Sequence, residues 1–348
     1  LFLSSFLFLL SSCAPQATET SQPITPQPLT VMTHDSFAVS EDVVKAFEEA
    51  NNAKVTFLQS GDTGSVLNKA ILTKDAPLAD VLFGVDNTFL SRALEAEIFE
   101  SYASPELANI PAAFKLDHSS RALPVDYGDV CINYDKAYFA ENALPVPQSL
   151  EDLTKPEYAK LLVVQNPATS STGLAFLFAT IAHFGEDDYL AYWSDLKAND
   201  VVVVDSWDTA YYTNFSASSG KGPQPMVVSY GSSPAAEVIF ADPPIDDAPT
   251  ASIIGTDTCF RQIEFVGILK GTRNRSLAEK FVDFMLGKQF QEDAPLQMFV
   301  YPVNSTAALP EAFTKYAQAP EQTAILAPDL IASNRDKWIQ EWTDAVMK

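Results

Sequence analysis

Short apolar runs alternate with amphipathic segments along the first hundred residues. The apolar runs at residues 29–33, 54–58 and 80–85 have the length and composition of strands. Two segments with apolar residues at helical spacing, residues 41–47 and 66–72, lie between these runs. This order of strand, helix, strand, helix and strand predicts a mainly parallel sheet flanked by helices.

The middle of the chain predicts strands of a second sheet. Residues 161–165, 201–205 and 226–230 are apolar runs of strand length, and residues 173–183 form a predicted helix between the first two. A further strand is predicted at residues 262–269. Two α/β lobes built from interleaved segments would leave a cleft between them, and small-molecule sites often lie in such clefts.

Two helices are predicted in the last quarter of the chain. Residues 276–279 have the sequence Ser-Leu-Ala-Glu, a capping box that predicts the start of a helix. In the final helix, Trp338 and Trp342 are four residues apart and would share one face. This spacing is more typical of a buried core than of a ligand site.

The N-terminal segment has the features of an export signal. Its first ten residues are almost wholly apolar, too few to span a bilayer, which needs about 20. Leu10-Ser11-Ser12-Cys13 is similar to a bacterial lipobox, whose cysteine is acylated. The residues after Cys13 are rich in Ala, Pro, Gln, Thr and Ser and cannot pack a core. We therefore expect a lipoprotein signal and flexible tether at residues 1–28, and a protein outside the cytoplasm that is held at the membrane only by lipid on Cys13.

Charge and cysteine content narrow the possible partners. The formal net charge of −23 disfavours nucleic acid and is compatible with positively charged small molecules, although it also serves solubility. After Cys13 two cysteines remain, Cys131 and Cys259. An even pair in an exported protein indicates a disulfide, with two unpaired thiols or a catalytic cysteine as the alternatives.

Six segments carry motifs of one known protein family. Their sequences are LTVMTHDSF at residues 29–37, ADVLFGVDN at 79–87, PVDYG at 124–128, NPATSSTG at 166–173, SYGSSP at 229–234 and YPV at 301–303. In this order and spacing they resemble the thiamine-binding subunits of bacterial ABC importers, and the resemblance covers nearly the whole chain after residue 28.

The resemblance implies an α/β type II periplasmic-binding fold with two lobes that close on a ligand. It places lobe 1 at residues 29–125 and 261–300, and lobe 2 at residues 126–260 and 301–348. The ligand would be thiamine or a thiamine phosphate, which a membrane permease with its own ATPase would receive. We expect a monomer that is not an enzyme and has no cofactor or metal.

The resemblance also assigns candidate ligand residues. Four residues fall on positions that contact ligand in that family: Asp62, Ser170, Trp207 and Tyr230. His34 stands where a tyrosine is common in the family, and Phe299 stands where a tryptophan is common. A further pocket tryptophan, expected soon after Phe37, is missing.

The residue types themselves fit a cationic ligand. Trp207, Tyr212 and Tyr230 could form an aromatic cage around a positive ring, although each could equally be a core aromatic. Asp62 could pair with an amino group or serve as a helix N-cap. Hydroxyls and backbone N–H groups before a helix suit a phosphate or alcohol, or simply cap the helix. The candidate hydroxyl residues are Thr169, Ser170, Ser171, Ser232 and Ser233, and Asp86 and Asn87 also follow a predicted strand.

Two other functions remain open on the sequence. Adjacent Tyr211 and Tyr212 with His34 resemble the ligand set of ferric-iron-binding proteins of the same fold. Alternatively, thiaminase I enzymes share the fold and use a cleft cysteine, here Cys131, with an acid such as Glu264 as base. The three histidines show no zinc-ligand spacing, and the chain has neither a nucleophile elbow nor a P-loop.

Overall fold

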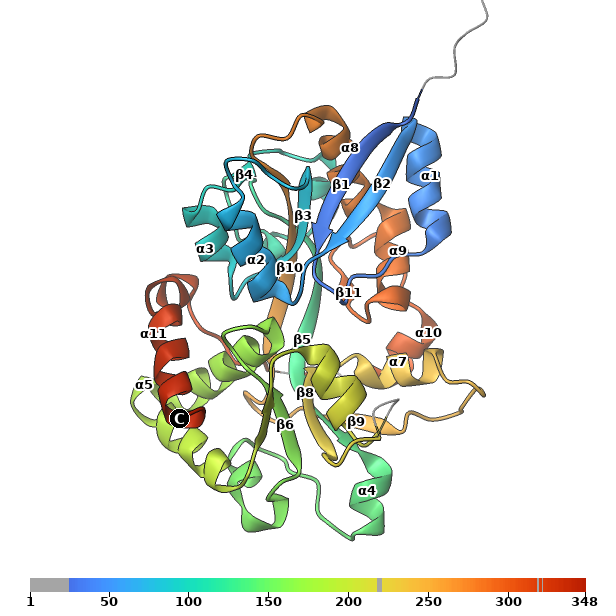
Figure 1. Ribbon diagram of the computed structural model, residues 1–348. Coiled ribbons are helices and arrows are strands. Elements are labelled where there is room, and N and C mark those ends of the chain that lie inside the picture. The colour runs from blue at the N-terminus through green and yellow to red at the C-terminus, as the bar shows by residue number, and fades with distance from the viewer. Residues whose placement is uncertain (1–24, 218–220, 318, 321) are drawn as a thin grey trace, which may run out of the picture.

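A computed structural model describes residues 25–217, 221–317, 319–320 and 322–348 (Figure 1). The predicted signal segment, Cys13 and most of the predicted tether lie outside these residues. The first strand begins at Gln27, so regular structure starts inside the predicted tether, which was placed at residues 1–28. Within the described part of the chain, no helix is both long and apolar enough to cross a membrane.

The strands and helices alternate through most of the chain. The strands are β1 Gln27–Thr33, β2 Ala53–Gln59, β3 Val81–Asp86, β4 Phe99–Glu100, β5 Leu123–Asp135, β6 Leu162–Gln165, β7 Val202–Val204, β8 Met226–Tyr230, β9 Thr250–Ile253, β10 Phe260–Leu269 and β11 Tyr301–Pro302. The helices are α1 Glu41–Asn51, α2 Thr63–Leu72, α3 Leu90–Glu95, α4 Lys136–Glu141, α5 Ser171–Ala198, α6 Trp207–Thr209, α7 Ser233–Ile239, α8 Arg275–Leu286, α9 Lys288–Gln297, α10 Glu311–Tyr316 and α11 Pro328–Val346. Shorter helical turns are η1 Pro105–Asn109, η2 Ala112–Phe114, η3 Glu151–Thr154, η4 Pro156–Tyr158 and η5 Ala210–Asn214.

The strands form one hydrogen-bonded path in the order β2-β1-β3-β10-β5-β8-β6-β7. The pairs β1–β2 and β1–β3 are parallel, as predicted, and so are β6–β7 and β6–β8. The prediction of a separate second sheet was wrong, because β10 and β5 pair antiparallel with each other and join the two halves through β3 and β8. Apolar runs indicate where strands lie, but they do not indicate which strands pair with each other.

The predicted two-lobed α/β fold is confirmed, and the two lobes lie above and below the middle of β5 and β10 (Figure 1). The upper lobe carries β1, β2 and β3 with α1, α2, α8 and α9, whereas the lower lobe carries β6, β8 and β9 with α4, α5 and α7. The lobe boundaries 29–125 plus 261–300 and 126–260 plus 301–348 stay a prediction. Residues 301–348 touch both lobes. The Asn304 backbone N–H donates to the Gln291 side chain, and the Asn304 side-chain amide donates to the Leu286 carbonyl, whereas α11 packs against α5.

Aromatic side chains fill the contact between α5 and α11. Trp342 meets Trp193 with ring centroids 5.4 Å apart, and Trp338 meets Phe178 at 5.8 Å. All four side chains are fully buried. The two tryptophans of the last helix are therefore core residues, as their spacing predicted. Their apolar cluster continues through β5 and β10 to α2 and α3, so it extends into both lobes.

Helix α5 is longer than the predicted helix at residues 173–183. It begins at Ser171 and ends at Ala198, with non-helical dihedral angles at Gly185 (φ 80°). Glycine adopts this positive φ without the steric cost that other residues incur. The chain therefore bends at Gly185 and resumes as a helix, where the sequence predicted an end.

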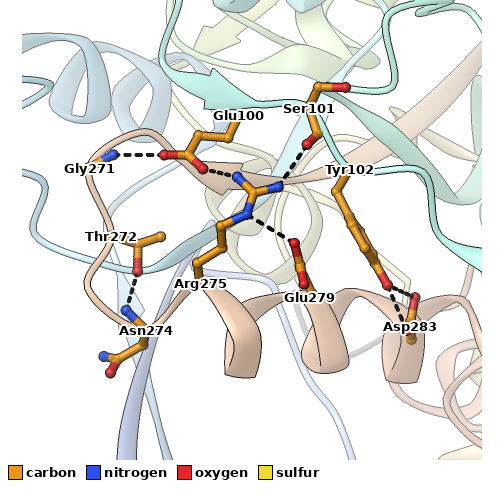
Figure 2. Close-up of polar contacts among 9 residues, drawn as sticks. All are labelled: Glu100, Ser101, Tyr102, Gly271, Thr272, Asn274, Arg275, Glu279 and Asp283. Atoms are coloured by element: carbon orange, nitrogen blue, oxygen red, sulfur yellow. Dashed lines mark hydrogen bonds and ion pairs between the residues drawn. The ribbon is translucent and has the colours of Figure 1, made fainter.

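Arg275, the first residue of α8, links this helix to β4 (Figure 2). The Arg275 guanidinium ion-pairs with Glu100 of β4, and its Nε donates to Glu279 one turn further along α8 at 2.9 Å. The predicted capping box was wrong, because α8 begins at Arg275 with Asn274 as N-cap, which leaves Ser276 inside the first turn. The Glu279 carboxylate is held by Arg275 instead of turning back to cap the helix.

A disulfide joins the two strands that connect the lobes. Cys131 of β5 and Cys259, immediately before β10, are bonded, with their Cα atoms 4.3 Å apart. Both residues are fully buried. The antiparallel register that pairs Phe260 with Val130 brings the two cysteines side by side. The predicted Cys131–Cys259 disulfide is therefore confirmed, and the alternative of two unpaired thiols is wrong.

Candidate functional site

A cavity of about 310 Å³ lies at the carboxyl ends of β1, β2 and β8. In open α/β sheets, ligands bind at this end of the strands. The segments that line it come from both halves of the sheet: the loop after β1, the N-termini of α2, α5 and α6, the middle of β10, and the end of α9. The lining residues are His34, Asp35, Ser36, Phe37, Ala38, Asp62, Thr63, Ser171, Thr172, Trp207, Asp208, Tyr212, Tyr230, Glu264, Gln297, Met298, Phe299 and Val300.

The cavity brings together most of the candidate ligand residues. The candidates that line it are His34, Asp62, Ser171, Trp207, Tyr212, Tyr230 and Phe299. Four other candidates, Thr169, Ser170, Ser232 and Ser233, do not line it. Because these residues are far apart in sequence, their convergence supports one ligand site, and their individual roles in binding stay a prediction.

The four remaining hydroxyl residues make hydrogen bonds within the protein. Thr169 donates to the Asp205 carbonyl at 2.7 Å, and Ser170 shares a hydrogen bond with Thr172 at 2.9 Å. The Ser232 hydroxyl donates to the Phe299 carbonyl. Ser233 shares a hydrogen bond of 2.9 Å with Ser229 of β8. These hydroxyls hold neighbouring segments in place around the cavity.

Aromatic rings form one side of the cavity. Trp207 is held by its indole N–H, which donates to Ser229 at 2.9 Å, and by a stacked contact with Tyr211 at 4.9 Å. Tyr212 stands edge-on to Trp207 at 5.4 Å, and Tyr230 lies 6.4 Å from it. Trp207 and Tyr230 are half-buried and Tyr212 is 42% exposed, so their rings are not sealed in the core. Such an arrangement suits a flat or cationic ring.

Asp62 places a carboxylate in the cavity at the start of α2. Its Oδ1 accepts a hydrogen bond from the Thr63 backbone N–H at 2.8 Å, so the residue is also the N-cap of α2. Its Oδ2 is buried and has no hydrogen-bond partner. Burial raises the pKa of this carboxyl, and the Thr63 N–H and the Ser170 hydroxyl oppose that rise. An unpaired buried acceptor is costly, and a ligand N–H would satisfy it.

His34 and Glu264 meet at the floor of the cavity. His34 Nε2 lies 3.3 Å from Glu264 Oε1, and both side chains are about nine-tenths buried. Burial lowers the pKa of His34, but Glu264, Asp62 and Asp208 together outweigh it and raise the pKa. His34 packs against Gly84, where an added Cβ would lie 2.3 Å from the imidazole. The glycine at this position, with φ +101°, therefore leaves the space that the imidazole occupies.

The charges around the cavity are mainly negative. Asp35, Asp62, Asp208 and Glu264 line it, and among the described lining residues there is no lysine or arginine. A site with this charge attracts a cation. The position of Glu264 in the cavity wall was not predicted, yet the sequence held a signal, since a lone acid inside an apolar strand is unusual. Asp208 was missed although it directly follows Trp207.

Asp86 and Asn87 make hydrogen bonds within the protein near the cavity, and neither forms part of its wall. Asp86 is fully buried and accepts hydrogen bonds from the Thr88 N–H and hydroxyl. Asn87 donates to the Arg261 carbonyl at 3.0 Å and accepts from the Ile263 N–H at 2.8 Å. Neither residue lines the cavity, so the structure gives them no direct contact with its contents.

The structure does not assemble the sites that the two alternative functions need. Of the tyrosine pair, Tyr212 lines the cavity, whereas the Tyr211 hydroxyl is buried and donates to Glu237. Paired phenolates facing one iron are therefore not formed. The thiaminase alternative needs a free Cys131 thiol, and Cys131 is bonded to Cys259.

Comparisons with known proteins point to one family. The Thiamine-binding periplasmic protein of Salmonella typhimurium is 31% identical over 351 aligned residues, which cover 99% of this chain and 100% of the relative. The Escherichia coli protein of the same name is 30% identical and covers 98% of this chain and 100% of the relative. A solved structure of a periplasmic thiamin binding protein superposes with a TM-score of 0.80 at 28% identity, covering 97% of this chain and 100% of the other.

The family assignment rests on more than these pairwise similarities. Residues 76–329, which include all elements from β3 to α10 and the start of α11, match the family described as bacterial extracellular solute-binding protein. The two-lobed fold with a cavity between segments of both halves agrees with that description. The chain belongs to the family of bacterial extracellular solute-binding proteins.

Proposed function

We propose that this chain is the extracytoplasmic binding component of an ABC importer for thiamine or a thiamine phosphate, and that it hands its ligand to a permease with a separate ATPase. The observation that carries the proposal is the convergence of three aromatic rings with a partly unpaired buried carboxylate, Asp62, in one cavity. The names of the relatives, which are thiamine-binding periplasmic proteins aligned over nearly the full chain, support the same ligand.

The chemistry of thiamine complements the cavity. Its thiazolium ring carries a permanent positive charge, and each aromatic face contributes about 0.5–2 kcal/mol of attraction to a cation. Trp207, Tyr212 and Tyr230 supply those faces, and the acidic lining adds long-range attraction. The amino group on the pyrimidine ring of thiamine is a donor, and Asp62 Oδ2 is the acceptor that lacks one.

The start of α5 suits the other end of the ligand. Ser171 and Thr172 line the cavity in the first turn of this helix. The N-terminus of a helix offers unpaired backbone N–H groups and a positive partial charge. An alcohol or a phosphate on the hydroxyethyl tail would bind there. Both thiamine and its phosphates therefore fit this proposal.

The proposal also covers where the chain acts, how it is anchored and how it presents its ligand. We place the chain outside the cytoplasm, anchored by lipid on Cys13, and we propose that it acts as a monomer without catalysis. Ligand binding between two lobes favours a closed arrangement, because contacts to both lobes exist only when they are near each other. The permease would recognise that closed form.

The proposal is tested by calorimetric titration of the protein with thiamine, thiamine monophosphate, thiamine diphosphate and ferric citrate. We expect saturable binding of at least one of the thiamine compounds, with one molecule bound per chain, and no binding of iron. Quenching of tryptophan fluorescence should follow the same curve, because Trp207 lines the cavity. Binding of ferric citrate with no heat from any thiamine compound would contradict the proposal.

A further inference from the structure

Three carboxylic acids stand in a row across three neighbouring strands beneath the cavity. In the antiparallel pairing of β10 with its two neighbours, Glu264 is opposite Asp86 of β3 on one side and opposite Asp126 of β5 on the other. Residues directly opposite each other in neighbouring strands have their Cβ atoms about 4.5–5.5 Å apart. The strand register therefore fixes the three side chains as direct neighbours.

This row is buried, and only its central member reaches the cavity. Asp86 and Asp126 are fully buried, and Glu264 is 7% exposed. Glu264 lines the cavity and meets His34 there. Asp86 is held by Thr88 and by the Gln262 side chain, which donates to it. Gln262 also accepts from the Tyr230 hydroxyl at 3.0 Å, which ties the row to the aromatic wall.

Two groups at this site lack the hydrogen bonds that their burial calls for. Both carboxyl oxygens of Asp126 are buried and accept no hydrogen bond from an N–H or hydroxyl group, and Nε2 of His34 has the Glu264 carboxylate as its polar neighbour at 3.3 Å. Unpaired polar atoms this deeply buried are rare in proteins and mark a strained or functional site. His34 and Glu264 both line the cavity, so a charge placed in the cavity lies close to this pair.

Three adjacent buried carboxylates cannot all be ionised without strong mutual repulsion, so the row retains protons. Burial and the neighbouring Glu264 raise the pKa of Asp126 well above its usual range. Burial raises the pKa of Asp86 to about 6, and Glu264 contributes to that rise. The pKa of His34 is also raised, because Glu264, Asp62 and Asp208 together favour its protonated form.

We propose that Glu264 is a further ligand-binding residue, and that a cation entering the cavity expels a proton held by His34 and the row Asp86–Glu264–Asp126. This inference rests on the proposed function, because it takes the thiazolium of thiamine as the cation. Glu264 lies next to the bound cation, and the protonation of its two buried neighbours, Asp86 and Asp126, changes when the cation binds. No bond other than an O–H or N–H is broken, and the proton passes to solvent.

The sign of the pH dependence follows from the electrostatics. A fixed positive charge repels the proton on His34 and stabilises the ionised forms of Asp86 and Asp126, so it lowers the pKa of these three groups. Protons leave on binding, and affinity therefore rises with pH while the free protein still holds them. The other ionisable groups that face the cluster are Asp62 of α2, Asp208 of α6 and Tyr230 of β8, and Asp35 lies at the rim. Those of these acids that are ionised also attract a cation into the cavity.

The test is calorimetric titration with thiamine at pH 6.5 in two buffers whose own ionisation enthalpies differ widely, such as MES and imidazole. The observed enthalpy should differ between the buffers by the amount that proton release into solution requires. The dissociation constant should fall between pH 5.5 and pH 7.5, by up to roughly tenfold per pH unit for one full proton released. The variant E264Q should bind several-fold more weakly, and its enthalpy should lose most of its dependence on the buffer.

Two controls keep the outcome clear. E49Q removes an exposed carboxylate of α1 and should reproduce the wild-type proton release. Thermal unfolding of E264Q shows whether that variant is folded, and the wild-type buffer comparison does not depend on it. Tight thiamine binding with the same enthalpy in both buffers and no pH dependence would overturn the inference and leave the proposed function intact. Absence of thiamine binding at every pH would overturn both.

Discussion

Replacing Asp62 by asparagine should weaken thiamine binding at least tenfold while leaving the fold almost as stable. Asparagine caps a helix about as well as aspartate, so the bond to the Thr63 N–H that starts α2 is retained. The variant loses the negative charge and the acceptor capacity of Oδ2, which is buried without a partner. A hydrogen bond to a charged group contributes about 1.5–3 kcal/mol, which corresponds to a factor of ten or more in affinity.

The measurement is a thiamine titration of D62N beside D35N, with thermal unfolding of both. Asp35 also lines the cavity but is exposed at its rim, so the loss of its charge should change affinity less than about threefold. Equal affinities for D62N and the wild type would remove Asp62 from the site. A similar loss in D35N would show that net charge, rather than a specific contact with Asp62, determines affinity.

Reducing the Cys131–Cys259 disulfide should lower the free energy of unfolding by roughly 3–5 kcal/mol. The bond closes a loop of 128 residues, and cross-links over long loops restrict the unfolded chain most. The effect should be visible as a lower urea midpoint with dithiothreitol. The double variant C131A/C259A should be destabilised further, because both side chains are fully buried and their truncation leaves space in the core.

Thiol counting in denaturant without reductant provides the control for this prediction. Apart from Cys13, the wild-type protein should show no free thiol, and the reduced protein should show two more. An unchanged urea midpoint after confirmed reduction would contradict the expected contribution of the bond. A wild-type protein with two free thiols besides Cys13 would contradict the bond itself.

The beginning of the fold was predictable because local pattern and tertiary pairing agree there. Each apolar run from β1 to β3 is followed by an amphipathic helix, and parallel strands need such crossovers. The pairing of β3, β10 and β5 was not predictable in the same way. These strands come from residues 81–86, 123–135 and 260–269, and apolar periodicity does not say which distant strands meet.

The same limit applies to the candidate site. Asp62, Trp207 and Tyr230 were found because they fall on positions that contact ligand in the family that the sequence resembles. Asp62 and Trp207 follow strands and Tyr230 ends one, which is where ligand residues often lie. Glu264 was considered only as a catalytic base, because its neighbours Asp86 and Asp126 become visible only through the strand register. The hydroxyls of Ser232 and Ser233 were candidates for binding, but the fold uses them to hold Phe299 and Ser229.

The most direct test is a crystal structure of the protein grown with thiamine. We expect the ligand in the cavity between the lobes, with its thiazolium ring against Trp207, Tyr212 or Tyr230 and its amino group within hydrogen-bond distance of Asp62. A structure with thiamine bound elsewhere on the molecule, and the cavity filled only by solvent, would contradict the proposed site.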